Sequence, residues 1–162
     1  MAKNRGPEWL NSAVFYEIYP QSFYDANGDG IGDLAGIMEK LDHISYIGCN
    51  AIWINPCYVS PFRDAGYDVS DYYRIAPRYG TNEDMKRLLE KAHAMDIKVC
   101  LDFVPGHTSI DHPWFIESGK PDKNKYSNYY TWTDSIWEEA QGRLKSISGL
   151  AERDGQYVTN FF

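Results

Sequence analysis

Hydrophobic residues in the N-terminal part of the chain follow two alternating patterns. Short runs of β-branched, aromatic and aliphatic residues predict strands over 13–19, 51–54 and 99–104. Apolar residues spaced three or four positions apart predict helices over 33–47 and 81–95. The order strand, helix, strand, helix, strand predicts an α/β protein with a parallel sheet and right-handed crossovers. Two architectures fit this order, a doubly wound sheet and a (β/α) barrel.

Residues at the expected helix ends support these assignments. Asp33 is placed to cap the first helix, and Gly48 is a natural stop just past its end. Thr81 and Asp84 have the spacing of a capping box, with aspartate in place of the usual glutamate. Both helices therefore have defined starts in the sequence itself.

The connections between these elements are unequal in length and polarity. The strand-to-helix segments are long and polar, with an irregular loop expected over 57–77, whereas the helix-to-strand turns are short. This asymmetry predicts that function lies at the carboxyl ends of the strands, as in both candidate architectures. No G-x-G-x-x-G motif follows the first strand, which counts against a dinucleotide-binding fold.

Beyond Ser109 the hydrophobic pattern loses its period. The residues from 109 to 162 are aromatic and polar without regular spacing, and they predict loops and short strands. A short helical turn is expected within 135–145. We therefore expect an α/β part followed by an irregular one.

Composition and charge narrow the classes of function. The 162 residues carry a net charge of −7 without a basic stripe, which argues against nucleic acid as a partner. No apolar run is long enough to span a membrane, and the first residues show no secretory signal. Three cysteines without metal-ligand spacing indicate a reducing cytoplasm. The 15% aromatic content fits either carbohydrate binding or an aromatic-rich core.

The loop after the first predicted strand has the spacing of a calcium site. Position 6 of this loop is Gly30, and position 12, where an EF-hand needs glutamate, is Gly36. Oxygen donors occupy positions 1, 3, 5, 7 and 9, the one at position 7 being a main-chain carbonyl: Asp25, Asn27, Asp29, Ile31 and Asp33. Ca²⁺ is expected rather than Mg²⁺, because a cage built wholly of protein atoms suits it better. The alternative is a Gly- and Asx-rich turn that caps the next helix.

Two further groups of residues suggest chemistry at the same edge of the sheet. Carboxylates and aromatic rings crowd the stretch 64–72, a combination that suits a neutral sugar, although a solvated acidic loop explains it equally well. Asp102 is expected inside the third strand, largely buried and paired. His107 follows five residues later, past the strand end, where it is free to reach into a cleft.

Six stretches in this order make the chain resemble a known family, the α-amylase family of glycoside hydrolases. They are residues 14–23, 29–34, 51–56, 66–72, 79–81 and 102–109. The chain is most similar to the N-terminal part of the oligo-1,6-glucosidase, α-glucosidase, trehalose synthase and sucrose isomerase branch.

The resemblance implies a partial (β/α)₈ TIM barrel. Residues 1–108 would supply its first three β/α units, and residues 109–162 a B domain inserted after strand three. It also implies a retaining α-glucoside hydrolase or transglycosylase that acts on short gluco-oligosaccharides or disaccharides.

The family's site residues map onto this chain one by one. Asp64 and His107 would bond the hydroxyls of a glucose unit, Tyr67 would stack on its ring, and Asp102 would be the framework carboxylate. The family's calcium loop maps onto Asp25 and the other oxygen donors named above, which implies a structural Ca²⁺.

Two departures from the family qualify these expectations. Gly106 stands where the family usually has asparagine. The family's nucleophile and acid/base are expected beyond Phe162, so this chain alone is expected to be inactive. A non-catalytic carbohydrate- or calcium-binding module, or a structural protein on a degenerate barrel, remain alternatives. Open strand edges predict self-association.

Overall fold

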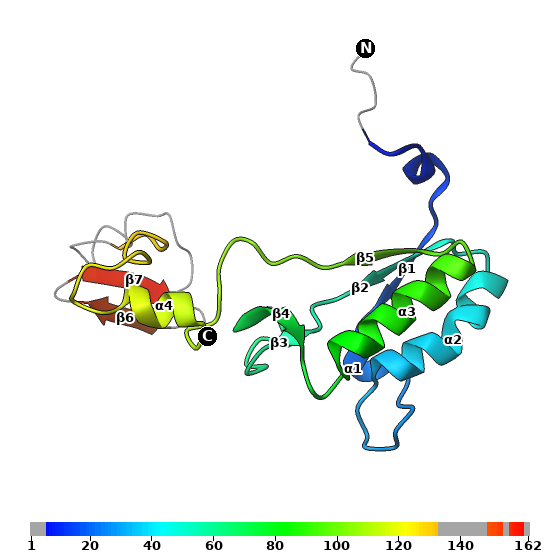
Figure 1. Cartoon of the computed structure of the whole chain (residues 1–162), viewed down its shortest axis with the longest axis horizontal. Coiled ribbons are helices and arrows are strands. Elements are labelled where there is room, and N and C mark those ends of the chain that lie inside the picture. Colours follow the sequence, from blue (N-terminus) through cyan, green and yellow to red (C-terminus); the bar gives the residue numbers. More distant parts are fainter. Residues whose placement is uncertain (1–5, 133–148, 154–155, 161–162) are drawn as a thin grey trace, which may run out of the picture. The chain divides into compact units, whose positions relative to one another are not determined.

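The structure, a computed structural model, describes residues 6–132, 149–153 and 156–160 (Figure 1). The chain divides into two compact units. The first comprises Met1–Cys57 and Arg74–Phe103, and the second comprises Tyr58–Tyr73 and Val104–Phe162. Each unit is described separately below.

The first unit is built on a three-stranded parallel sheet. Its strands are β1 (Phe15–Ile18), β2 (Ala51–Ile54) and β5 (Lys98–Leu101), in the order β1-β2-β5. The helices α2 (Leu34–Tyr46) and α3 (Asn82–Ala94) pack against each other beside this sheet (Figure 1). The predicted alternation of strands and helices is confirmed.

The predicted helix ends are confirmed as well. The Asp33 side chain caps α2 by accepting a hydrogen bond of 2.6 Å from the Gly36 amide. Thr81 and Asp84 form the capping box of α3 with both reciprocal bonds present. Gly36 is required for another reason, because a Cβ at that position would lie 2.0 Å from the Tyr24 carbonyl oxygen.

The core of this unit lies between the helices and one face of the sheet. Its fully buried side chains include Ile18, Leu34, Ile37, Leu41, Ile44, Ile52, Ile54 and Leu88. Each such side chain contributes roughly 1.5–3 kcal/mol when it leaves water. The neighbouring row of paired strand residues consists of Glu17, Trp53 and Cys100. The Trp53 side chain in this row is 43% exposed. The core is thus one-sided within the residues that the structure describes.

The structure corrects the expected limits of the outer strands. β5 ends at Leu101, so Asp102 follows the strand instead of lying inside it, and its side chain is half-buried rather than largely buried. The first strand covers Phe15–Ile18 and is flanked by the short helices η1 (Glu8–Ser12) and α1 (Pro20–Phe23). Pro20 suits the first position of α1, since proline has no amide hydrogen to leave unpaired there.

The second unit contains more regular structure than the sequence indicated. β3 (Tyr58–Val59) and β4 (Asp71–Ile75), whose last two residues are counted with the first unit, form a two-stranded sheet within the segment expected as an irregular loop. The short helix α4 (Pro113–Ser118) was not expected either. The hairpin of β6 (Gly149–Arg153) and β7 (Gln156–Asn160) agrees with the short strands predicted there. The helical turn predicted within 135–145 lies outside the described residues.

Aromatic side chains hold the described part of the second unit together. The rings of Trp114 and Tyr129 lie 5.5 Å apart, and those of Phe115 and Tyr130 lie 5.1 Å apart. The Trp132 indole donates a 2.8 Å hydrogen bond to the buried Ser118 hydroxyl. These aromatic residues therefore serve as packing. The division at 108/109 stays a prediction.

Candidate functional site

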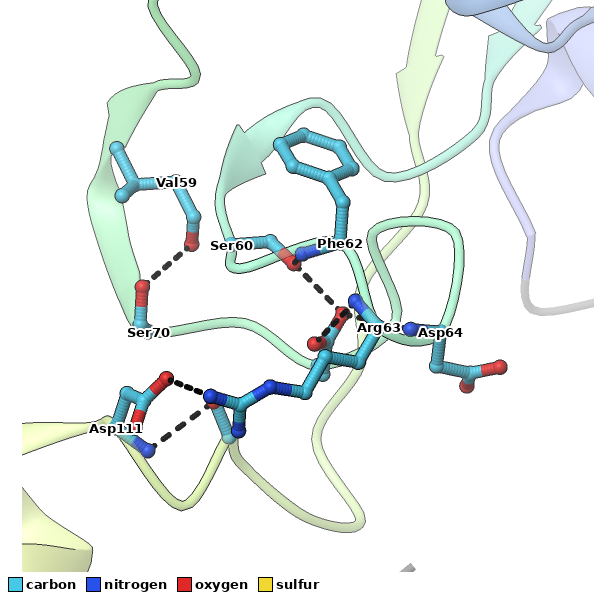
Figure 2. A network of polar contacts seen from close by, with 9 residues as sticks. Val59, Ser60, Phe62, Arg63, Asp64, Ser70 and Asp111 are labelled. Atoms are coloured by element: carbon cyan, nitrogen blue, oxygen red, sulfur yellow. Dashed lines mark hydrogen bonds and ion pairs between the residues drawn. The ribbon is translucent and has the colours of Figure 1, made fainter. Parts of the chain in front are cut away.

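One candidate site is a loop folded around the buried carboxylate of Asp68. Figure 2 labels its partners Ser60, Arg63 and Asp64. Asp68 is fully buried, with a relative exposure of 0%. Its Oδ1 accepts hydrogen bonds from the Ser60 hydroxyl at 2.6 Å and the Asp64 amide at 3.3 Å. Its Oδ2 accepts one from the Arg63 amide at 3.0 Å. The loop thus satisfies a buried charge with three donors, as burial of a charge requires.

The same loop contains strained backbone. Phe62 and Ala65 have φ values of 57° and 53°, in the left-handed region that costs non-glycine residues roughly 1–2 kcal/mol each. The Ser60 hydroxyl accepts a 2.8 Å bond from the Phe62 amide, which supports one of these residues. Such strain persists only where surrounding contacts maintain it.

A second loop, residues 104–112, is bonded to the first. The Ser109 amide donates to the Val69 carbonyl at 2.9 Å. The Arg63 guanidinium lies 3.2 Å from the Asp111 carboxylate, and both side chains are 48% exposed (Figure 2). Main-chain and side-chain contacts therefore both join the two loops.

The structure brings together three of the predicted sugar-binding residues. His107 Nε2 lies 3.0 Å from the Tyr67 carbonyl oxygen, and the Tyr67 amide donates to the Asp64 carbonyl at 2.8 Å. Asp64 and Tyr67 are half-buried, and His107 is exposed. The Asp64 carboxylate points away from the Asp68 network (Figure 2). These contacts run through the main chain of Asp64 and Tyr67. A carboxylate, an aromatic ring and an imidazole carried on two joined loops can recognise the hydroxyl groups and the apolar face of a sugar.

Asp102, the fourth predicted site residue, belongs to the other compact unit. It follows β5 directly, and its amide donates to the Ile54 carbonyl at 2.8 Å. This bond continues the pairing of β5 with β2 by one residue.

Besides Asp68, two residues that support this site were missed by sequence reasoning. The Tyr72 hydroxyl lies 2.6 Å from the Val104 carbonyl oxygen and 3.0 Å from that of His107. Burial, with smaller effects of Tyr130 and Tyr58, raises the pKa of Tyr72, so it stays a neutral donor. Tyrosine is common in this sequence, and no spacing distinguished Tyr72 from the others.

His112 is the second missed residue. It is only 5% exposed, and its Nδ1 accepts a 3.0 Å bond from the Trp114 amide at the start of α4. Burial lowers the pKa of His112, and the nearby charge of Asp71 opposes this only in part. The neutral ring therefore serves as the helix cap, and the Pro113 that follows was the one available hint.

The predicted calcium loop is ordered by its own side chains. Asp25 accepts bonds of 2.7 Å from the amides of Gly28 and Gly30, both of which have positive φ. Asn27 accepts from the Asp29 amide at 2.9 Å. Hydrogen bonds from the main chain, above all from Gly30, lower the pKa of the Asp25 carboxyl despite the opposing effect of desolvation.

The remaining donors of this loop have local partners too. Asp29 accepts from the Ile31 amide at 2.8 Å, and Asp33 caps α2. Within the described part of the chain, no three His, Cys, Asp or Glu residues are grouped so as to hold a metal ion. Carboxylate oxygens retain further lone pairs when they accept one bond, so this donor set is chemically suited to a hard cation.

Gly106, the position that departs from the family pattern, lies in open space. A Cβ built there would meet nothing within 4 Å among the described residues. Steric crowding therefore does not require glycine before His107. In the same described ranges, none of the helices has the length and apolar character to cross a bilayer.

The chain is similar to one family model and to several known proteins. Residues 17–147 match the model of the alpha amylase catalytic domain. The oligo-1,6-glucosidase of Heyndrickxia coagulans is 56% identical over 161 residues, which cover 96% of this chain and 29% of that protein. The trehalose-6-phosphate hydrolase of Bacillus subtilis (strain 168) is 42% identical, with 99% and 30% covered.

Solved structures show the same relationship. The trehalose-6-phosphate hydrolase of Bacillus licheniformis superposes with a TM-score of 0.85 at 44% identity, over 93% of this chain and 28% of that one. The trehalulose synthase of Pseudomonas mesoacidophila MX-45 does so with 0.76 at 48% identity, over 81% and 24%. The chain thus spans less than a third of the length of these relatives. Because the family model covers most of its residues, the chain belongs to the alpha-amylase catalytic domain family.

Proposed function

We propose that this chain is the N-terminal part of a retaining α-glucoside hydrolase or transglycosylase that acts on short gluco-oligosaccharides or disaccharides. The observation that carries the proposal is the grouping of Asp64, Tyr67 and His107 on two bonded loops. The relatives support it, since they are named as oligo-1,6-glucosidases and trehalose-6-phosphate hydrolases.

Each residue has a role in this proposal. The Tyr67 ring stacks on the apolar face of a glucose unit, and Asp64 accepts hydrogen bonds from its hydroxyls. His107 bonds another hydroxyl, and its contact with the Tyr67 carbonyl orients the imidazole. Asp102 serves as the framework carboxylate.

The proposed domain division places these residues in a larger protein. Residues 1–108 form the first three β/α units of a TIM barrel, and residues 109–162 belong to a B domain inserted after the third strand. The parallel sheet with its two helices corresponds to such units of the α-amylase family barrel. The antiparallel pair β6–β7 suits an inserted domain better than the barrel wall.

The chain alone is proposed to be inactive. A retaining mechanism needs a nucleophile and an acid/base roughly 5–5.5 Å apart, and in this family both follow later strands. The chain's coverage of 29% of a full-length relative fits this view. Hydrolysis of aryl α-glucosides by the isolated chain, abolished by Asp64→Asn or Asp102→Asn, would overturn it.

Sugar recognition is tested separately, with methyl α-D-glucopyranoside as the probe. We expect binding in an NMR titration, weakened about tenfold by Asp64→Asn because a charge-assisted hydrogen bond is lost. Asp42→Asn, which changes an exposed carboxylate of α2, is the matched control and should bind like the parent chain. Equal affinity for both variants would remove Asp64 from the site.

Ca²⁺ is the proposed structural cation of the first long loop. The oxygens of Asp25, Asn27, Asp29, Asp33 and the Ile31 carbonyl would hold it. A bound Ca²⁺ would tie these side chains together and rigidify the start of α2. Calorimetric titration with CaCl₂ should show heat that Asp25→Asn abolishes and that Asp96→Asn, an exposed carboxylate beside Lys98, retains. No heat with the parent chain would refute the site.

The chain is also proposed to self-associate through its open strand edges. Within the described residues, β1 and β5 each pair along one edge only, and open parallel edges promote association. Sedimentation velocity should therefore detect oligomers, and a single monomeric boundary would contradict this.

The three cysteines are free thiols, as suits a reducing cytoplasm, the proposed location.

A further inference from the structure

We propose that Asp68 is a positioning residue, whose buried carboxylate sets the main-chain conformation that presents Asp64 and Tyr67 to a sugar. The proposal rests on the function proposed above for those two residues. Asp68 is itself fully buried. It therefore acts through the loop and not by contact with the ligand.

The contacts of Asp68 define what it holds. Its three donors come from Ser60, Arg63 and Asp64, at the beginning and the middle of the same loop. Two of them are main-chain amides of consecutive residues, so the carboxylate determines how this peptide segment is oriented. Asp68 thus binds the main chain of Arg63, whereas Asp111 binds its guanidinium group.

The strain in the loop shows why such an anchor is needed. Phe62 and Ala65 adopt left-handed φ values on either side of the two amides that Asp68 binds. Without the carboxylate these residues would relax toward the right-handed or extended regions, which are favoured for residues with a Cβ. Asp64 lies between them and would move with the relaxation.

A chain of bonds transmits the position of Asp64 to the other sugar-binding residues. The Asp64 carbonyl accepts from the Tyr67 amide, and the Tyr67 carbonyl lies next to the His107 imidazole. The residue after Asp68, Val69, accepts from Ser109 on the second loop. One buried carboxylate therefore organises residues on both loops.

The chemistry of this site requires a carboxylate rather than an amide. All three partners donate, so Asp68→Asn would place an NH₂ group opposite an N–H in either orientation of the amide. If the NH₂ group takes the position of Oδ1, it faces the Asp64 amide N–H. If it takes the position of Oδ2, it faces the Arg63 amide N–H. Asparagine has nearly the same shape, so this variant tests the hydrogen bonds without opening a cavity.

The experiment measures amide hydrogen exchange by NMR in the full chain, without any sugar. Asp68→Asn should accelerate exchange of the Arg63 and Asp64 amides about tenfold or more, since hydrogen bonds to a charged group are lost. Ser60→Ala, which removes one donor to Asp68 and the acceptor for Phe62, should act in the same direction. Amides of α2 and α3 should keep the parent rates.

Two controls match these changes. Asp71→Asn removes the same charge three residues away, where the amide oxygen can still accept from Tyr73. Ser70→Ala removes a hydroxyl that bonds the Val59 carbonyl and does not contact Asp68. Neither control should alter exchange at Arg63 and Asp64.

The outcomes separate this proposal from the function on which it rests. Unchanged exchange in Asp68→Asn, or equal acceleration throughout the chain, would overturn the positioning role. Where the parent chain binds methyl α-D-glucopyranoside, Asp68→Asn should weaken binding at a temperature at which both chains are fully folded, and undiminished affinity would also overturn the positioning role. If the parent chain binds no glucoside, the proposed function fails, while the exchange rates still decide whether Asp68 positions the loop.

Discussion

Two loops of this chain are each organised by one aspartate that accepts main-chain hydrogen bonds, and they differ in burial. In the first unit, Asp25 binds the amides of Gly28 and Gly30 in an exposed loop. In the second unit, Asp68 binds the amides of Arg63 and Asp64 while it is fully buried. Both carboxylates accept main-chain hydrogen bonds, which are 2.7 Å long at Asp25 and 3.0 and 3.3 Å long at Asp68.

Because the two carboxylates differ in burial, the loss of their hydrogen bonds should affect stability differently. Water can replace a hydrogen bond lost from an exposed carboxylate, so its net contribution to stability is small. Water reaches the part-buried donors around Asp68 less readily, so more of the cost of desolvation remains when their acceptor is removed. The Asp25 loop has positive φ at the glycines 28 and 30, whereas the Asp68 loop has it at Phe62 and Ala65 as well as at Gly66. Four predictions test this difference, in order of decreasing effect.

The largest effect is expected for Asp68→Ala. The change leaves the Arg63 and Asp64 amides and the Ser60 hydroxyl without their acceptor, so we expect a loss of about 3 kcal/mol in the free energy of unfolding. Urea unfolding followed by tryptophan fluorescence measures it. A loss no greater than that of Asp25→Ala would show that burial does not separate the two loops.

A smaller effect is expected from acidification, through His112. Burial lowers the pKa of His112 in the folded chain, so below its unfolded pKa of 6.5 the unfolded chain binds the extra proton. Stability should therefore decrease as the pH falls from 7.5 to 5.5. His112→Asn keeps an acceptor for the Trp114 amide and should flatten this part of the profile. An unchanged slope in that variant would contradict the assignment.

A third change tests a contact of intermediate exposure. Arg63 and Asp111 form an ion pair with both side chains 48% exposed. Because solvent screens such pairs, Arg63→Ala should cost only about 0.5 kcal/mol, and 1 M NaCl should remove most of this difference. Thermal unfolding at two salt concentrations measures it. A salt-independent loss would indicate that the guanidinium stabilises the loop by packing.

The smallest effect is expected at Asp25. Main-chain hydrogen bonds lower its pKa below the ordinary value of 3.8, so its contribution to stability is present above that value and is lost as the pH falls through the folded pKa. A carboxyl ¹³C titration should give a midpoint below 3.8. In metal-free buffer Asp25→Asn should melt close to the parent temperature. A midpoint above 3.8 would refute the hydrogen-bonded state.

The comparison also explains which elements could be predicted from the sequence. The helices α2 and α3 follow from apolar spacing and from caps that lie within three residues of the amides they bind. Strand β2 follows from a short apolar run that is bounded by Asn55 and Pro56. These features are local, so the residues that cause them are neighbours in the chain.

The pairing of β3 with β4 and the end of β5 could not be predicted in this way. β3 has only two residues and no hydrophobic alternation to mark it. Asp102 lies in a hydrophobic run that continues to Val104, although β5 ends at Leu101. Where a strand stops depends on its partner, here β2, which ends at Ile54 in the paired register.

The residues of the candidate site also separate into those identified from local motifs and those that depend on tertiary contacts. Asp64, Tyr67 and His107 were identified by their resemblance to family motifs, and the structure places them on two bonded loops. Asp68, Tyr72 and His112 were not identified by their roles, since each acts through a partner that is distant in sequence or through its burial. The sequence by itself determined the order of the three parallel strands and of α2 and α3, the caps of these helices and the family, because these depend on local spacing and short motifs. Only the tertiary structure decided that Asp68 is buried, and burial is what distinguishes its hydrogen bonds from those of Asp25.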